Sequence, residues 1–324
     1  MIRAGIIGGS GYTGGELIRL LINHPECQIG FVYSTTRAGS PVYKAHPDLL
    51  GQTDLLFVDQ VDPEVDVVFL CLGHGNSGRF LKDWEFNPAT RIIDLSNEFR
   101  LEEKASLRKR TFVYGLPELQ KERIAEAENI ANPGCFATAI QLALLPLADQ
   151  GLLSDKVHIH ALTGSTGAGA GLSETSHFSW RNNNVSWYKP FTHQHLGEIY
   201  RHLNQLQKAS TDLQFLPLRG NFARGIFATA YTSFGGNLED AQMYYREYYR
   251  EAPFTLITEE PPDLKQVVNT NAAHIHLHLH EGVLLITSVI DNLLKGASGQ
   301  AVQNMNLMFG LPETTGLQLK AIGF

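Results

Sequence analysis

The sequence has few cysteines and no excess of positive charge. Its 324 residues include only 3 cysteines, without paired spacing, which argues against a disulfide framework and is typical of a reducing compartment. Lys and Arg number 26 against 33 Asp and Glu, so the formal net charge is −7, whereas nucleic-acid-binding proteins usually carry a basic excess. We therefore expect no nucleic-acid partner.

Long hydrophobic runs are also missing. No apolar stretch approaches the ~20 residues that a membrane-spanning helix needs. The first residues, MIRAGIIGGSGYTG, reach glycines too early for a secretory signal. No internal repeat and no low-complexity linker is visible. A composition of 43% hydrophobic and 18% charged residues is typical of a globular chain with two domains, which we expect in the cytoplasm and away from membranes.

The first part of the chain alternates short apolar runs with helical patterns. Runs that end in glycine or a polar residue occupy residues 2–8, 28–34, 65–73 and 91–96. Residues 15–23 have helical spacing and stop before Pro25. Continuous apolar strands that alternate with helices favour a parallel sheet covered on both faces. Residues 1–132 are therefore predicted to form a Rossmann-type, doubly wound α/β domain.

The pattern changes near Asn132. Longer strand candidates follow, in KVHIHALTGS, GIFATAYTSF and HIHLHLHEGVLLITSVI, with helical patterns over residues 198–207 and 238–250. Strands joined by turns rather than regular crossovers indicate an α+β domain with a mostly antiparallel sheet. We assign residues 133–297 to this catalytic and oligomerisation domain. The C-terminal segment 298–324, helical at its start, is expected to rejoin the first domain.

A glycine-rich loop, GGSGYTGG, follows the first predicted strand and opens the first helix. Glycines allow the backbone to approach a phosphate closely, and helix N–H groups stabilise the anion. The alternative is a glycine-rich turn without a ligand, but the strand–loop–helix context favours a dinucleotide site. The candidate cofactor-binding residues of this loop are Gly8, Ser10, Gly11, Tyr12, Thr13 and Gly14.

The second predicted strand lacks the acid that usually binds the ribose of NAD. It ends in FVYSTTRAG, where Ser34 and Arg37 stand instead. A hydroxyl and a guanidinium suit the 2′-phosphate of NADP. The sequence therefore predicts NADP(H) as cofactor, unless Arg37 is only a solvated loop residue.

Cys135 lies at the start of an apolar helical pattern, in ANPGCFATAIQL. The unpaired N–H groups and the dipole of a helix N-terminus lower the pKa of a thiol, so Cys135 is predicted to be a nucleophile rather than a buried structural residue. Gly134 leaves room for a substrate. Cys71 falls within an apolar strand and Cys27 follows a helix end, so both are expected to be inert.

The stretch FTHQHLGEIY contains the best candidate base. His193 and His195 could activate a cysteine, and Glu198, three residues after His195 on a helix, could orient its imidazole. The alternative is ordinary surface polarity at a helix start.

A second histidine cluster is HIHLHLH. Its four histidines would share one face of a strand. Tetrahedral metal sites normally draw ligands from more than one element, so we predict no metal there. The four are His274, His276, His278 and His280.

Together these motifs resemble the N-acetyl-gamma-glutamyl-phosphate reductases, relatives of aspartate-semialdehyde dehydrogenase. The resemblance runs nearly end to end, through GGSGYTGGEL, DLSNEFRL, YGLPEL, NPGCFAT, TGSTGAGAG, THQHLGEI, RGIFAT and DNLLKGASGQAVQNMNLMFG. It implies NADPH-dependent reduction of N-acetyl-L-glutamyl 5-phosphate to the semialdehyde in arginine biosynthesis, through a cysteine thioester. It also implies a homodimer or homotetramer.

The resemblance also implies residue roles. Cys135 would be the nucleophile and His195, or His193 beside it, the acid/base, supported by Glu198. Arg224 would anchor a carboxylate or phosphate of the acyl-phosphate substrate. Further cofactor-binding candidates are Lys295 and Gly296, and weaker substrate-binding candidates are Ser96 and Arg100.

Three positions depart from the family's pattern. Phe136 replaces the usual tyrosine and Ala137 the usual proline after the cysteine, and Gly197 replaces a proline in the histidine motif. Because glycine loosens a helix, the acid/base geometry is the least secure inference. The sequence leaves open an N-succinyl-glutamyl or carrier-linked aminoadipyl phosphate as substrate. A non-catalytic NADPH-binding regulator is the alternative from another class, although both thiol and base are present.

Overall fold

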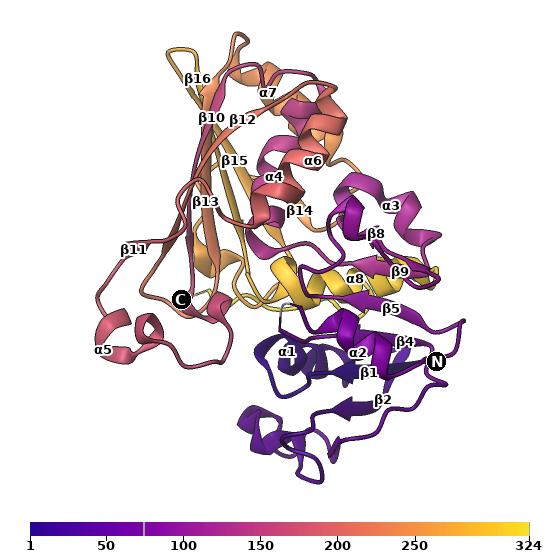
Figure 1. Ribbon diagram of the computed structural model, residues 1–324. Helices are drawn as coiled ribbons and strands as arrows, with labels where there is room; N and C mark the ends of the chain where they lie inside the picture. Colours follow the sequence, from indigo (N-terminus) through magenta and orange to yellow (C-terminus); the bar gives the residue numbers. More distant parts are fainter. Residues whose placement is uncertain (74, 324) are drawn as a thin grey trace. The chain divides into compact units, whose positions relative to one another are not determined.

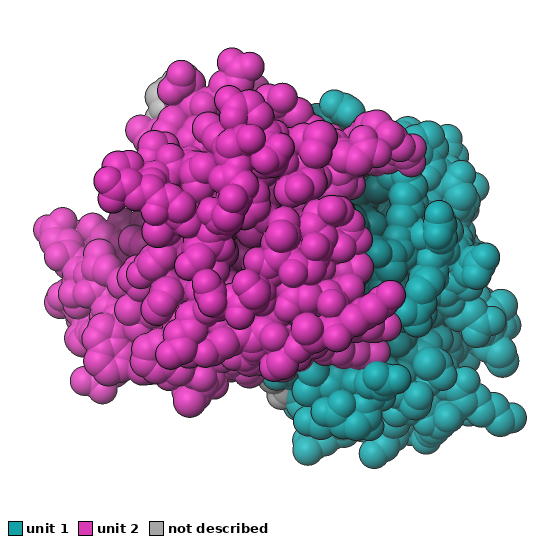
Figure 2. All heavy atoms as spheres, turned by 90° about the horizontal axis from the view of Figure 1, so that it is seen from above, with its two compact units in different colours: residues 1–134, 297–318 teal, residues 135–296, 319–324 magenta. Residues whose placement is uncertain are grey.

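The chain divides into two compact units. The computed structural model describes residues 1–73 and 75–323. Residues 1–134 and 297–318 form the first unit, and residues 135–296 with the chain from Leu319 on form the second (Figure 2). The expectation that all of 298–324 rejoins the first domain fails at its end. There Ile322 N–H donates to the Val268 carbonyl at 3.3 Å, and Gly323 N–H to that of Lys265 at 3.2 Å.

The first unit is built on a parallel sheet. Its strand order in the described chain is β3-β2-β1-β4-β5-β9-β8, and every pair is parallel, as predicted. The order reverses between β1 and β4, where doubly wound sheets bind ligands. The strands are β1 (Ile2–Ile7), β2 (Cys27–Tyr33), β3 (Phe57–Val58), β4 (Val67–Leu70), β5 (Arg91–Asp94), β8 (Val113–Tyr114) and β9 (Asn129–Ala131), with a separate β6 (Ser106–Leu107) and β7 (Arg110–Thr111) hairpin.

The helices of this unit are α1 (Tyr12–Leu21), α2 (Ser77–Asp83), α3 (Pro117–Ala125) and α8 (Gly299–Met308). Every residue of α8 is buried, and α8 packs beside α1 and α3 (Figure 1). The C-terminal segment 298–324 is helical at its start, as predicted, with the last helix expected over 298–309 and found at Gly299–Met308. The helix stops because Gly310 has a left-handed φ of 69° and Pro312 follows.

The second unit is built on a mixed sheet of order β11-β12-β10-β13-β16-β15-β14 within the described chain. Only β10–β12 and β14–β15 pair in parallel, so the mostly antiparallel sheet is confirmed. The histidine-rich stretch forms two strands, because Glu281 and Gly282 both have positive φ and close a tight hairpin turn. The strands are β10 (Lys156–Thr163), β11 (Ser186–Trp187), β12 (Asp212–Arg219), β13 (Ile226–Ser233), β14 (Thr255–Ile257), β15 (Ala273–His280) and β16 (Val283–Ile290).

Three helices pack over one face of this sheet (Figure 1): α4 (Cys135–Asp149), α6 (His195–Gln207) and α7 (Leu238–Tyr248). α4 is buried along residues 136–148 and contacts both other helices and the sheet. Shorter turns are η1 (Val42–Lys44), η2 (Pro47–Leu49), η3 (Glu102–Lys104), η4 (Ser165–Ala168), η5 (Glu174–Ser176), α5 (Phe178–Arg181), η6 (Leu264–Gln266) and the π-turn η7 (Leu294–Ser298). None of the described helices combines the length and apolarity needed to cross a membrane.

α4 contains a proline in its interior, and a tyrosine compensates for it. Pro146 has no N–H, so the carbonyl of Leu142 loses its usual partner in the helix. The hydroxyl of Tyr249 donates to this carbonyl at 2.6 Å, and that of Tyr245 donates to the carbonyl of Ala143. Two phenols therefore connect α7 and the residue that follows it to α4, the helix that begins at Cys135.

We predict that Tyr249→Phe lowers the apparent free energy of unfolding by about 1–3 kcal/mol, because the buried Leu142 carbonyl loses its donor. In a Pro146→Ala background the helix regains an N–H, and the same change should cost less than about 1 kcal/mol. Urea unfolding of the four proteins of this cycle measures both. Tyr244→Phe, on the same helix, is the matched control. If Tyr249→Phe lowers the free energy of unfolding equally in the wild type and in Pro146→Ala, Tyr249 does not compensate for the proline.

Candidate active site

Cys135 is the first residue of α4 and stays partly exposed, although residues 136–148 of the helix are buried. The three residues before it follow β9 and are buried. Asn132 anchors this turn: its N–H donates to the Asp94 carbonyl at 2.8 Å, and its side-chain amide donates to the carbonyl of Ala297 at 3.1 Å. The thiol therefore lies on a rigid support at a helix N-terminus.

Gly296 lies against Cys135. It belongs to the π-turn η7, a type of turn that is frequent at functional sites. A Cβ at Gly296 would lie 2.8 Å from the Cβ of Cys135, so only glycine fits. The neighbouring Lys295 is fully buried, with its ammonium 5.9 Å from the ring centroid of Phe254. The structure thus brings the predicted cofactor-binding pair Lys295 and Gly296 next to the predicted nucleophile.

The two candidate histidines lie at the start of α6, which forms despite Gly197. His193 and His195 are both buried, and their ring centroids are 4.6 Å apart. Both rings contact Phe136 edge-on, at 5.4 Å and 6.2 Å, and Phe136 directly follows Cys135. Glu198 is also buried, in the first turn of the same helix. The residue that follows the predicted nucleophile therefore contacts both predicted bases.

The two histidines are not equivalent. Burial lowers the pKa of His193 to about 4, and the positive charge of Lys189 adds to the effect. The Nδ1 atom of His193 accepts a hydrogen bond from the backbone N–H of His195 at 3.3 Å. His193 is thus neutral near pH 7 and supports the start of α6.

Arg224 is paired with a buried acid. Its Nε donates to Asp291 Oδ2 at 3.0 Å, and its Nη2 donates to Oδ1 at 3.1 Å. Asp291 is fully buried and also accepts hydrogen bonds from the N–H groups of Asn269 and Leu293. The charge of Arg224 is therefore neutralised within the protein, and its role as a substrate anchor stays a prediction.

Two residues near the histidines were not picked out from the sequence. The ring of Tyr188 lies 5.7 Å from that of His193, and the guanidinium of Arg219 lies 4.7 Å from the Tyr188 ring. Burial raises the pKa of Tyr188 to about 12, and the negative charge of Cys135 contributes to the shift. The only available signal was that Tyr188 shortly precedes the histidine motif; Arg219 carried none.

The weaker substrate candidates make hydrogen bonds within the first unit. Ser96 and Ser77 donate to the two carboxylate oxygens of Asp94 at 2.7 Å and 2.6 Å, and burial raises the pKa of this carboxyl. Arg100 donates from Nε to the carbonyl of Asn132 at 2.8 Å. Both residues thus support the end of β5 and the turn before Cys135.

The glycine loop has the geometry of a phosphate-binding turn. Gly8 has a φ of 81°, and a Cβ at Gly14 would lie 2.6 Å from the Cα of Gly9, so strand and helix approach closely only with glycine. Gly11 is the N-cap of α1, and no side chain caps this end, which leaves the helix terminus to an anion. Ser10, Tyr12 and Thr13 lie in the same turn.

The end of β2 carries a buried hydroxyl and, after it, an exposed cation. Ser34 is buried, with its Oγ 3.2 Å from that of Ser10. Arg37 is exposed, and its guanidinium donates to the Lys44 carbonyl at 3.5 Å. A hydroxyl and a guanidinium are compatible with the 2′-phosphate of NADP(H), and this choice of cofactor stays a prediction.

The histidine cluster of β15 lies on one face of the strand, as the alternating burial shows. His276 Nδ1 contacts the Thr258 carbonyl at 3.1 Å, and His274 Nδ1 contacts Gln266 Oε1 at 3.4 Å. Among the described residues, no group of three or more His, Cys, Asp or Glu side chains could hold a metal ion.

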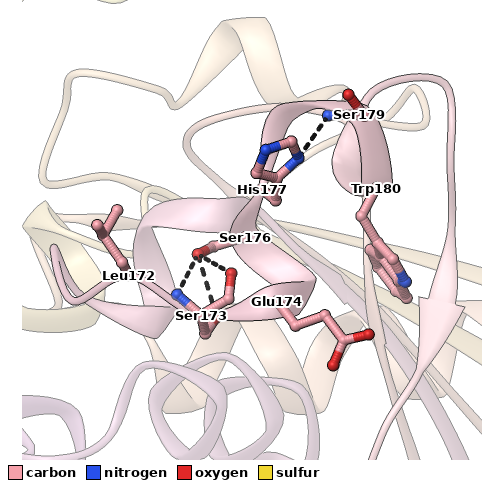
Figure 3. A pocket seen from close by; sticks show the side chains of 7 residues that line it. All are labelled: Leu172, Ser173, Glu174, Ser176, His177, Ser179 and Trp180. Atoms are coloured by element: carbon pink, nitrogen blue, oxygen red, sulfur yellow. Dashed lines mark hydrogen bonds between the residues drawn. The ribbon is translucent and has the colours of Figure 1, made fainter.

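A separate hollow of 760 Å³ lies in the second unit (Figure 3). None of its lining residues is a predicted site residue, and a hydrogen bond between the Ser173 and Ser176 hydroxyls holds part of its wall. The ring of Trp180, in the same wall, packs 4.7 Å from the guanidinium of Arg181. The lining residues are Leu172, Ser173, Glu174, Ser176, His177, Ser179 and Trp180.

Comparisons with known proteins identify the family. Residues 3–127 match the semialdehyde dehydrogenase NAD binding domain, and residues 135–292 match the semialdehyde dehydrogenase dimerisation domain. The N-acetyl-gamma-glutamyl-phosphate reductase of Christiangramia forsetii is 60% identical over 99% of both chains, and that of Flavobacterium johnsoniae is 59% identical over 100% of both. The chain belongs to the N-acetyl-gamma-glutamyl-phosphate reductase family. It is accordingly a nicotinamide-dependent oxidoreductase, and the suspected resemblance is confirmed.

Solved structures agree with this reductase family in fold. Aspartate semialdehyde dehydrogenase II from Vibrio cholerae, complexed with ASA, has a TM-score of 0.73 at 15% identity and covers 96% of this chain, which covers 98% of that one. Aspartate semialdehyde dehydrogenase with NADP from Candida albicans has a TM-score of 0.69 at 15% identity, with 95% and 98% covered. At this identity the likeness shows the semialdehyde dehydrogenase fold alone.

We predict that His193 makes the reductase sensitive to acid. Its pKa is about 4 when folded and near 6.5 when unfolded. Between these values the unfolded chain binds a proton that the folded chain does not, so stability is lost as the pH falls from 6.5 toward 4. The loss attributable to His193 should reach about 3 kcal/mol.

Urea unfolding of wild type and His193→Gln from pH 7 to pH 4.5 measures this effect. The variant should lose less stability on acidification than the wild type. His280→Gln, at an exposed site of the same unit, is the control and should follow the wild type. Parallel curves for wild type and His193→Gln would refute the assignment.

Proposed function

We propose that this reductase converts N-acetyl-L-glutamyl 5-phosphate to N-acetyl-L-glutamate 5-semialdehyde, with NADPH as reductant, release of phosphate and a place in arginine biosynthesis. The observation that carries the proposal is Cys135 at the start of α4, with Gly296 against it and the two histidines of the α6 start against the neighbouring Phe136. Relatives at 60% identity are named for this substrate. Their identity as reductases disfavours the non-catalytic regulator.

The chemistry starts at Cys135. Its sulfur attacks the C5 carbonyl; a C–S bond forms, the C–O bond to the phosphate breaks, and the acyl group is held as a thioester. NADPH, when bound, supplies the hydride that reduces this carbonyl. Cys135 then leaves as the thiolate when the thiohemiacetal collapses to the aldehyde. Gly296 keeps the space beside the sulfur open for the acyl group.

His195 is the better of the two acid/base candidates. His193 is committed to the backbone N–H of His195 through Nδ1, and its pKa of about 4 makes it a poor proton donor near neutral pH. We therefore assign to the His195 imidazole the proton that the thiohemiacetal oxygen gains and later returns. Glu198 supports His195 from the same helix turn.

The other predicted residues complete the proposal. The loop from Gly8 to Gly14 would bind the pyrophosphate, Ser34 and Arg37 the 2′-phosphate, and Lys295 with Gly296 would flank the nicotinamide. Substrate contacts are assigned to Arg224, with Ser96 and Arg100 as weaker candidates. N-succinyl-glutamyl phosphate and carrier-linked aminoadipyl phosphate remain the alternative substrates.

We expect Cys135 to be the only cysteine that reacts rapidly near pH 7. Burial raises the thiol pKa of Cys27 and of Cys71 to about 12. Iodoacetamide should therefore label Cys135 first, with activity falling in step, as peptide mass spectrometry and assay can follow. Cys135→Ser should keep its fold and NADPH binding but lose turnover by at least ~100-fold. Cys27→Ala is the control; near-normal activity of Cys135→Ser would refute covalent catalysis.

Cofactor choice should depend on Arg37. Arg37→Ala should raise the KM for NADPH about tenfold or more and change the KM for NADH little, because only NADPH carries the phosphate that the guanidinium binds. Steady-state kinetics with both cofactors measure the ratio. Lys44→Ala, which removes a neighbouring cation, is the matched control. An equal effect of Arg37→Ala on both cofactors would remove Arg37 from the phosphate site.

We also propose a homodimer or homotetramer. Helices cover one face of the second sheet, and the opposite face carries half-buried side chains such as Phe227, Thr229 and Tyr231. The name of the matched dimerisation domain supports this assignment. Light scattering at micromolar concentration should give at least twice the 35.9 kDa chain mass, and a monomer would contradict the proposal.

A further inference from the structure

Arg219 is the last residue of β12, on the side of the strand that faces the candidate site. Leu213, Phe215 and Pro217 alternate as the buried residues of this strand, and Arg219 continues their series. The ring of Phe215 contacts those of Phe136 and His193, at 5.3 Å and 5.6 Å. Arg219 therefore extends from the sheet toward the start of α4.

Tyr188 connects Arg219 to Cys135. The guanidinium of Arg219 lies 4.7 Å from the Tyr188 ring and donates a hydrogen bond to its hydroxyl. The negative charge of Cys135 contributes to the raised pKa of the same tyrosine. The ring of Tyr188 also lies 5.7 Å from that of His193. Arg219, Tyr188 and Cys135 thus interact electrostatically within the second unit.

Arg219 has a cationic neighbour but no acid. Arg181 is buried and donates to backbone carbonyls, to that of Thr175 at 3.0 Å and that of Arg219 at 3.1 Å. Within residues 1–73 and 75–323, Arg219 donates to the hydroxyl of Thr175, at 3.4 Å, and to that of Tyr188. In the described parts of the chain, no carboxylate lies within ion-pair distance of either arginine.

The two arginines therefore differ from Arg224, whose charge is matched by Asp291. Burial and then the charge of Arg219 lower the pKa of Arg181, which shows that two cations lie close together. Two adjacent cations, one of them buried and the other half-buried, are stabilised when an anion binds between or beside them. An anion bound by Arg219 would therefore lie beside Tyr188, whose ring is 4.7 Å from the guanidinium.

We propose that Arg219, held in place by Arg181 and Tyr188, binds a carboxylate of the substrate, in place of Arg224. A planar guanidinium suits a carboxylate, which can accept two of its N–H groups. The proposal rests on the proposed function, in which the substrate is an N-acyl-glutamyl phosphate with an α-carboxylate. A dicarboxylic acyl group such as N-succinyl would supply a second carboxylate. The carboxylate bound by Arg219 is therefore either the α-carboxylate or that of the acyl group.

The test uses the reverse reaction of the full-length protein, from the semialdehyde, phosphate and NADP⁺. Arg219→Gln should raise the KM for the semialdehyde about tenfold or more, and leave those for phosphate and NADP⁺ within about twofold. Arg219→Lys should recover part of the loss, which a merely structural role would not predict. Arg246→Gln, at an exposed arginine of α7, is the matched control. Circular dichroism verifies folding, and Arg219→Lys carries the test if the Gln variant fails to fold.

Two semialdehydes distinguish the two sources. A defect confined to the N-succinyl compound assigns the acyl carboxylate to Arg219, and an equal defect with the N-acetyl compound assigns the α-carboxylate. Both outcomes support the subsite. A rise in the KM for phosphate alone, or a semialdehyde defect in Arg224→Gln but not in Arg219→Gln, overturns it.

Failure of the proposed function itself has a different signature. The wild type would then turn over neither semialdehyde. In that case, protection of Cys135 from iodoacetamide decides the subsite. N-acetyl-glutamate or N-succinyl-glutamate should slow alkylation of the wild type and not of Arg219→Gln, and equal rates in the two proteins overturn the proposal.

Discussion

The contact between Gly296 and Cys135 is the constraint on which the candidate site depends. α4 is buried from residue 136 to residue 148, so the cysteine at its start cannot turn away from its neighbours. On one side the π-turn brings Gly296 to within van der Waals contact, and any side chain there would displace the cysteine. Space at the sulfur therefore depends on two elements far apart in the sequence.

Asp291 binds both the π-turn η7 and Arg224. Its carboxylate accepts hydrogen bonds from the N–H groups of Leu293 and Leu294 at 2.7 Å and 3.0 Å, and its carbonyl accepts one from the N–H of Gly296 at 2.9 Å. The same carboxylate binds Arg224 in two places. Burying a carboxylate is costly unless its oxygens accept hydrogen bonds, and these donors offset that cost. The charge of Arg224 is therefore matched by Asp291 and serves to hold the fold together. The charges of Arg219 and Arg181 are not matched by a carboxylate among the described residues.

Features confined to one short stretch could be predicted from the sequence. The loop from Gly8 to Gly14 was recognisable because strand, turn and helix follow each other directly, and Ser34 stands at the end of the next strand. β12 was not recognised, because Pro217 lies within it and proline argues against a strand. The strand tolerates this proline where only the short β11 pairs beyond it. Because β12 is not evident in the sequence, the position of Arg219 at the end of a strand could not be predicted.

The sequence by itself determined the two-part architecture, the family, and the residue types of the nucleophile, its histidines and the phosphate-binding loop. Each of these depends on periodicity or spacing over a few neighbouring residues. Only the tertiary structure decided which arginine carries an unmatched charge, which histidine is neutral, and which glycine leaves room at the thiol. Each of these depends on distances between residues of different elements, among them β12, η7 and α4. Those distances are set only when the sheet and its helices pack together.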